Sequence, residues 1–94
     1  MCGRVTLTIP DADQLAMLLE ADLSPEHAVR YRPRYNVAPA QEHWIVRRGP
    51  TGRQLYPATW GLRTRQGDLL FNARSETAAE KWPFRSAFSG RRCL

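Results

Sequence analysis

The sequence predicts an α+β fold in which mainly antiparallel strands are accompanied by short flanking helices. Three observations support this prediction: the chain opens with an alternating stretch, its middle holds two strand-like stretches around a Gly-Pro-Thr-Gly turn, and helix start signals occur in both halves. Alternation of apolar and polar residues is typical of half-buried strands, whereas apolar residues three and four apart indicate helices. The 94 residues make one small domain at most, with a thin core.

The first predicted strand covers residues 4–9, where polar and apolar positions alternate strictly. Its apolar residues, Val5, Leu7 and Ile9, fall on one face, and the stretch is rich in β-branched residues. We therefore expect a strand that holds the N-terminus against a sheet.

A helix is predicted directly behind this strand. Asp11 is the expected N-cap, and Gln14 follows three residues later as in a capping box. The helix is expected to end before Pro25. Its predicted apolar stripe consists of Leu15, Leu18 and Leu19.

The central part of the chain predicts a loop followed by a hairpin. Residues 31–41 (YRPRYNVAPAQ) contain two prolines and no helical period, so we expect an extended or turn segment instead of a regular element. Residues 44–48 and 54–62 are predicted strands joined by the Gly-Pro-Thr-Gly turn, with Pro57 interrupting the second.

The last third of the chain predicts short elements. A polar loop over 63–68 precedes residues 69–71, an apolar run that fits a buried strand. Residues 77–80 fit a capping box at the start of a short helix, and a further helix is expected over 83–90. Residues 91–94 resemble the beginning of another strand, so the natural domain is expected to continue beyond them.

The charge balance is basic. Fourteen Lys and Arg residues against nine Asp and Glu give a net charge of +5, and thirteen of these cations are arginine. The planar guanidinium suits bidentate phosphate contacts and stacking on bases, which favours a nucleic-acid partner. Arginine used for solubility explains the same bias, so charge alone does not decide between the two interpretations.

Neither a disulfide nor a metal site is expected. Cys2 and Cys93 stand at opposite ends of a chain that lacks a signal peptide, and such chains seldom form disulfides. Together with His27 and His43 they lack the paired spacing of a zinc site. No apolar run approaches the ~18 residues of a membrane span, and we expect a cytoplasmic protein without a cofactor.

Six short blocks give the chain a specific resemblance. They are MCGR at 1–4, RYNVAPAQ at 34–41, WGL at 60–62, NARSETAAEK at 72–81, FR at 84–85 and RRCL at 91–94. In this order they resemble the SRAP family (SOS response-associated peptidase), also called abasic-site processing proteins. The resemblance implies that residues 1–94 are the N-terminal portion of a single SRAP domain, with part of a mixed, barrel-like sheet.

The resemblance also implies a chemistry for Cys2. SRAP proteins lose Met1 and then bond covalently to abasic sites in single-stranded DNA, whose ring-opened sugar is an aldehyde. An α-amine with a pKa of ~7.7–8.0 is partly neutral at physiological pH and adds to an aldehyde as a Schiff base. The thiol of the same residue then closes a thiazolidine ring, helped by its proximity. Without the motif, Cys2 would be a small residue near a frayed end.

Further site residues follow from the matching blocks. Asn72 corresponds to the family's active-site asparagine, which orients the Cys2 amine or the sugar oxygen; a strand-end turn is its structural alternative. The expected DNA contacts are phosphate binding by arginine, close approach at glycine and base packing by the loop residues. These contacts are assigned to Gly3, Arg4, Asn36, Pro39, Arg74 and Arg85.

Two departures from the family pattern define a second hypothesis. Residues 63–68 are short and lack the tryptophans that family members use as a wedge at duplex junctions. The family's catalytic glutamate and later histidine lie beyond Leu94. The alternative is therefore a catalytically impaired module that binds single-stranded DNA or another chain, with self-association completing the sheet. A generic RNA-binding module is a third, weaker alternative because no RNP-like motif occurs.

Overall fold

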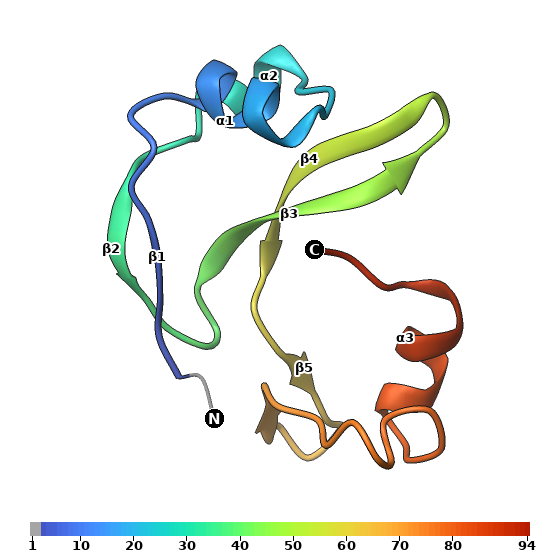
Figure 1. The fold of residues 1–94 in the computed structure, drawn as a ribbon. Coiled ribbons are helices and arrows are strands. Elements are labelled where there is room, and N and C mark those ends of the chain that lie inside the picture. Colours follow the sequence, from blue (N-terminus) through green and yellow to red (C-terminus); the bar gives the residue numbers. More distant parts are fainter. Residues whose placement is uncertain (1–2) are drawn as a thin grey trace.

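The structure, a computed structural model, describes residues 3–94 and has the predicted α+β composition (Figure 1). The elements in chain order are β1 (Val5–Leu7), α1 (Ala12–Leu19), α2 (Pro25–Ala28), β2 (Arg34–Val37), β3 (Glu42–Gly49), β4 (Gly52–Thr59), β5 (Leu62–Arg63), β6 (Leu69–Leu70) and α3 (Phe84–Gly90). The strands pair as three antiparallel two-stranded sheets, β1–β2, β3–β4 and β5–β6. The expected barrel-like sheet is not found in residues 3–94, because these three pairs are not joined into a closed sheet.

The first strand keeps the predicted alternation but is shorter than expected. Its apolar positions are half-buried and its polar positions are exposed from residue 4 to residue 9, although only Val5–Leu7 pair as a strand. Val5 lies opposite Val37 and Leu7 opposite Arg34, with a bulge between them. The expectation that residues 31–41 contain no regular element is therefore wrong, because β1 supplies the partner that makes Arg34–Val37 a strand.

Helix α1 begins as predicted. The Asp11 side chain accepts a hydrogen bond of 2.8 Å from the Gln14 N–H, which satisfies one free backbone donor of the first turn. The helix ends at Glu20, which adopts a left-handed conformation with φ 51°. The predicted apolar stripe is only partly correct: Leu15 is buried, whereas Leu18 is 64% exposed. Ala12 and Ala16, on the same face as Leu15, are buried in its place.

Removing the helix cap gives a first testable prediction. Asp11→Ala is expected to lower the free energy of unfolding by about 1 kcal/mol, because the Gln14 N–H loses its acceptor. Urea unfolding monitored by circular dichroism measures this change. Asp11→Asn retains a side-chain acceptor and serves as the matched control, with a smaller expected loss. Equal losses in both variants would show that the cap hydrogen bond is not the cause.

The core lies where α1 meets the β3–β4 hairpin. Its buried cluster consists of Ala12, Leu15, Ala16, Tyr31, Val46 and Leu55. Tyr31 connects this cluster to the first strand, because its hydroxyl donates a hydrogen bond of 2.7 Å to the Ile9 carbonyl and its ring contacts Trp44 edge-on at 5.5 Å. Burial, and secondly the charge of Asp11, raise the pKa of Tyr31. The hydroxyl therefore stays protonated as a donor across the physiological pH range.

The central hairpin is confirmed. Strands β3 and β4 pair from Glu42 opposite Thr59 to Gly49 opposite Gly52, across a two-residue turn. On the outer side of β4, Asp22 forms a parallel bridge: its N–H donates to Arg53 and its carbonyl accepts from Leu55. These contacts show that the backbone groups of Arg53 and Leu55 point away from β3. The same direction at position 57 explains why a proline is tolerated in β4. Position 57 faces the same outer edge as 53 and 55, so it removes no hydrogen bond to β3.

Strands β5 and β6 enclose the predicted polar loop. Gly61, before β5, has φ +113°, and an added Cβ would lie 2.7 Å from Leu69 Cδ1, so glycine is required here. The prediction of a buried strand over 69–71 is wrong in its burial: Leu69 and Leu70 are half-buried and Phe71 is 40% exposed. Leu70 and Phe71 line an open hollow of about 570 Å³ beside the last helix, so solvent reaches them.

The C-terminal part differs from expectation in two places. Residues 75–80 form hydrogen-bonded turns instead of the predicted short helix, beginning with the Thr77 N–H on the Arg74 carbonyl. Helix α3 then covers almost all of the predicted range 83–90. Residues 91–94 form no assigned strand, but Val46 and Leu94 exchange two backbone hydrogen bonds of 2.8 and 3.0 Å. The end of the described chain thus lies against the free edge of β3 (Figure 1).

Candidate nucleic-acid interface

The residues that lead into β1 are exposed at the start of the described chain. Cys2, the predicted nucleophile, lies outside the described residues. Gly3 is half-buried, and an added Cβ would meet no atom within 4 Å. Arg4 is exposed and its guanidinium donates to the Gly3 carbonyl at 3.0 Å. The open surroundings of Gly3 and the free face of Arg4 suit contact with another molecule.

The segment that carries Asn36 and Pro39 is stabilised by hydrogen bonds to the Gln41 side chain. The Gln41 side-chain oxygen accepts from the Ala38 N–H at 3.0 Å and from Arg34 at 2.7 Å. In the same segment, the Ala40 N–H donates to the Trp60 carbonyl at 2.8 Å. Asn36 is exposed on β2 and Pro39 is half-buried. These hydrogen bonds give the turn a defined shape.

The predicted residues of the later blocks lie on exposed chain. Asn72 and Arg74 stand in the irregular segment after β6, and Arg85 lies in the first turn of α3. All three are exposed. Apart from the bond between Arg4 and its neighbour Gly3, no hydrogen bond joins the predicted site residues within residues 3–94. The described chain therefore presents them as separate surface groups, not as an assembled site.

A small hollow beside the first strand was not predicted. It has a volume of about 250 Å³, and its wall is mostly apolar. Val5 and Cys93 both line it, and His43 of β3 is one of its polar groups. Because Val5 follows Cys2 by only three residues, this hollow lies within ~10 Å of chain length from the predicted nucleophile.

The histidine of this hollow is held neutral. Burial is the larger cause that lowers the pKa of His43, and the nearby Arg34 guanidinium lowers it further. A lowered pKa keeps the imidazole uncharged at neutral pH. Its place could have been predicted from the hairpin register, because alternation along β3 puts His43 and Ile45 on one face.

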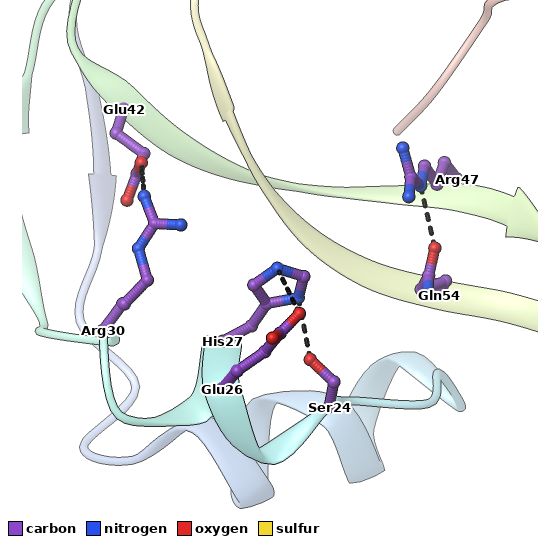
Figure 2. A network of polar contacts seen from close by, with 7 residues as sticks. All are labelled: Ser24, Glu26, His27, Arg30, Glu42, Arg47 and Gln54. Atoms are coloured by element: carbon purple, nitrogen blue, oxygen red, sulfur yellow. Dashed lines mark hydrogen bonds and ion pairs between the residues drawn. The ribbon is translucent and has the colours of Figure 1, made fainter.

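Arginines gather on the hairpin and on the last described residues. Arg47 of β3 donates to the Gln54 side-chain oxygen at 2.8 Å (Figure 2). Its guanidinium carbon also lies 3.6 Å from the centre of the Tyr56 ring. By contrast, Arg30 pairs with the carboxylate of Glu42, so its charge is compensated (Figure 2). The Arg-Arg pairs at 47–48 and 91–92 are visible in the sequence, but their proximity depends on the fold.

The whole chain matches one family. Residues 1–94 fit the model of the SOS response associated peptidase (SRAP) family, and the chain belongs to that family. It is similar to the abasic site processing protein YobE of Bacillus subtilis (strain 168), with 33% identity over 100 aligned positions. It is also 33% identical to YoqW and 32% identical to YoaM of the same organism, which carry the same description.

These matches cover the chain completely but the relatives only in part. The alignments include 100% of this chain and 45%, 44% and 43% of the three relatives. The chain thus spans somewhat less than half the length of the curated relatives it matches. No solved structure matches it significantly. Among the helices of residues 3–94, none has the length and apolar character needed to cross a bilayer.

Proposed function

We propose that this chain is the N-terminal portion of a single SRAP domain that processes abasic sites in DNA. The observation that carries the proposal is the MCGR start, which puts Cys2 directly before β1 in a chain 33% identical to abasic site processing proteins. The substrate is single-stranded DNA with an abasic nucleotide, met during the DNA damage (SOS) response. Its place of action would be the nucleoid in the cytoplasm.

The proposed reaction is a condensation at one residue. After Met1 is removed, the neutral α-amine of Cys2 adds to the aldehyde carbon, and loss of one water molecule leaves a Schiff base. The thiol sulfur then adds to the same carbon, and its proton moves to the nitrogen. The product is a thiazolidine that joins protein and DNA, with one water released and no oxidation or reduction. Amine and thiol share one residue, which favours ring closure.

The other predicted residues bind and orient the substrate. An amide such as Asn72 can hold the amine or the sugar oxygen without fixing the amine as an ammonium. The exposed guanidinium groups of Arg4, Arg74 and Arg85 are proposed to bind phosphates, which suits a protein that recognises damage and ignores sequence. Asn36 and Pro39 are proposed to contact bases next to the abasic site.

The proposal is tested with the purified chain. We expect a covalent product on a denaturing gel when the chain is incubated with single-stranded DNA carrying one abasic site. Its mass should equal protein without Met1 plus DNA less one water. DNA with a tetrahydrofuran in place of the abasic sugar lacks the aldehyde and should give no product. A chain that has lost Met1 and still yields no product contradicts the crosslinking proposal.

Two observations favour a second candidate function: no hydrogen bond joins Asn72 and Arg4 within residues 3–94, and the chain spans under half of its relatives. On this alternative, the chain binds single-stranded DNA or a second copy of itself without efficient crosslinking. General acid–base groups raise reaction rates roughly 10²–10⁴-fold, so a chain without the family's glutamate and histidine would crosslink slowly. Sedimentation of the chain with and without intact DNA distinguishes DNA binding from self-association.

A further inference from the structure

Five arginines surround two adjoining hollows at the β3–β4 hairpin. The larger hollow has a volume of about 640 Å³ and the smaller about 310 Å³. Both are lined by Arg47, Arg48, Arg92 and Cys93, so they lie next to each other. Arg53 completes the wall of the first and Arg91 that of the second. We call these five arginines the arginine surface.

The charge of the arginine surface is barely compensated. Among the residues that line the two hollows, none is an aspartate or glutamate. Within residues 3–94, the one ion pair that these arginines form joins Arg53 to Glu20 at 3.7 Å, and the Glu20 side chain is 83% exposed. An exposed pair at this distance contributes little. The surface therefore has a strongly positive potential, which attracts polyanions and concentrates them at the hollows.

Several of these guanidinium groups are held by neutral partners. Arg47 is held by the Gln54 side chain (Figure 2) and by the Tyr56 ring. Arg91 donates to the Ser86 hydroxyl at 3.1 Å. Arg92 lies 5.2 Å from the centre of the Phe88 ring. Such contacts orient the charges without neutralising them, so less rotamer freedom is lost when an anion binds.

The arginine surface is continuous with the hollow beside the first strand. Cys93 lines that hollow as well as both hollows of the arginine surface. Val5, the first residue of β1, lines the first-strand hollow too. A strand of nucleic acid that reaches the start of β1 can therefore continue past Cys93 onto the hairpin.

We propose that the arginine surface binds the phosphodiester backbone of single-stranded DNA that flanks the abasic nucleotide. This inference rests on the proposed function and extends it to arginines to which the family resemblance gave no role. Guanidinium groups suit phosphate because their planar donors form bidentate hydrogen bonds. Tyr56 and Phe88 carry arginines on their faces, so contact here is to phosphates and not to stacked bases. The surface thus adds affinity without sequence preference.

The test removes two positive charges that carry no hydrogen bond within residues 3–94. The variant is Arg48→Gln with Arg92→Gln, and the probe is a fluorescent single-stranded oligonucleotide without any abasic site. Each lost phosphate contact lowers the salt slope of binding to single strands by about 0.7, so the double variant should lose about 1.4. At moderate salt, its affinity should fall about 10- to 30-fold, which anisotropy titrations measure.

A matched control separates position from total charge. Arg65→Gln with Lys81→Gln removes the same charge from two exposed residues that line neither hollow and donate no side-chain hydrogen bond within residues 3–94. The control should bind nearly as the parent chain does, and all three proteins should share the same unfolding midpoint. Equal losses in both double variants, or no loss in either, would overturn the inference. The inference would also be overturned if a polyglutamate peptide bound as tightly as the oligonucleotide and lost the same affinity in the Arg48/Arg92 variant.

Crosslinking of abasic DNA and binding of intact DNA test the proposed chemistry and the arginine surface separately. If the chain crosslinks abasic DNA but the Arg48/Arg92 variant binds intact DNA normally, only the role of the arginine surface is wrong. If no crosslink forms but intact DNA binds through these arginines, only the proposed chemistry is wrong.

Discussion

A chain carrying Cys2→Ser is expected to lose at least about 100-fold of its heat-stable crosslink to abasic single-stranded DNA. Serine keeps the α-amine, so the Schiff base still forms. The hydroxyl, however, is a much weaker nucleophile than the thiol and does not close a stable ring. The reversible imine therefore returns to amine and aldehyde on heating. A denaturing gel run with and without prior heating measures the difference.

Reduction by borohydride provides the control for this variant. It converts a Schiff base to a stable amine, so Cys2→Ser should give a trapped product in an amount close to that of the parent chain. Cys2→Ala should behave in the same way, because it too keeps the amine. A heat-stable product from Cys2→Ser without borohydride would show that the thiol is not part of the linkage. Intact mass must first show that each variant has lost Met1.

The second large effect is expected in the core. Leu55→Ala should lower the free energy of unfolding by about 2–5 kcal/mol, because it removes a side chain that is only 1% exposed and leaves a cavity. The residue packs in the cluster between α1 and the hairpin, and its N–H is bonded to Asp22. For a small domain, this loss is a large part of the whole stability. Denaturant unfolding measures it.

The chain provides a matched control for this substitution. Leu18→Ala makes the same chemical change on α1, where the side chain is 64% exposed. Its effect should stay within about 0.5 kcal/mol. If Leu55→Ala leaves too little folded protein to measure, Leu55→Val replaces it, with a smaller but still larger loss than Leu18→Ala. Similar losses for the leucines at 18 and 55 would mean that the core does not lie between α1 and the hairpin.

Local chemistry made much of the fold predictable. The cap at Asp11 fixes the start of α1 because its acceptor lies three residues from the donor. The hairpin is equally local, since a two-residue turn determines the whole register from Gly49 and Gly52 outward. The alternation before Ile9 also predicted which side chains are exposed. These features depend on neighbours in the sequence, which the sequence displays directly.

The parts that could not be predicted depend on distant partners. Strand β2 exists because β1 pairs with it, and nothing between Tyr31 and Gln41 indicates this. The capping box at Thr77 predicted a helix, but a few residues without a packed apolar face form only turns. The family blocks indicated the candidate site residues, whereas the arginine surface needed the fold to bring Arg48 and Arg92 together.

The pairing of β1 with β2 has a consequence for the order of folding. The β3–β4 hairpin is local and can form in about 1–10 μs, whereas β1 must wait for a partner that lies beyond both α1 and α2. During synthesis at about 5–20 residues per second, the first strand leaves the ribosome long before Val37 does. Residues 5–7 are thus ordered late, after their strand partner has been made.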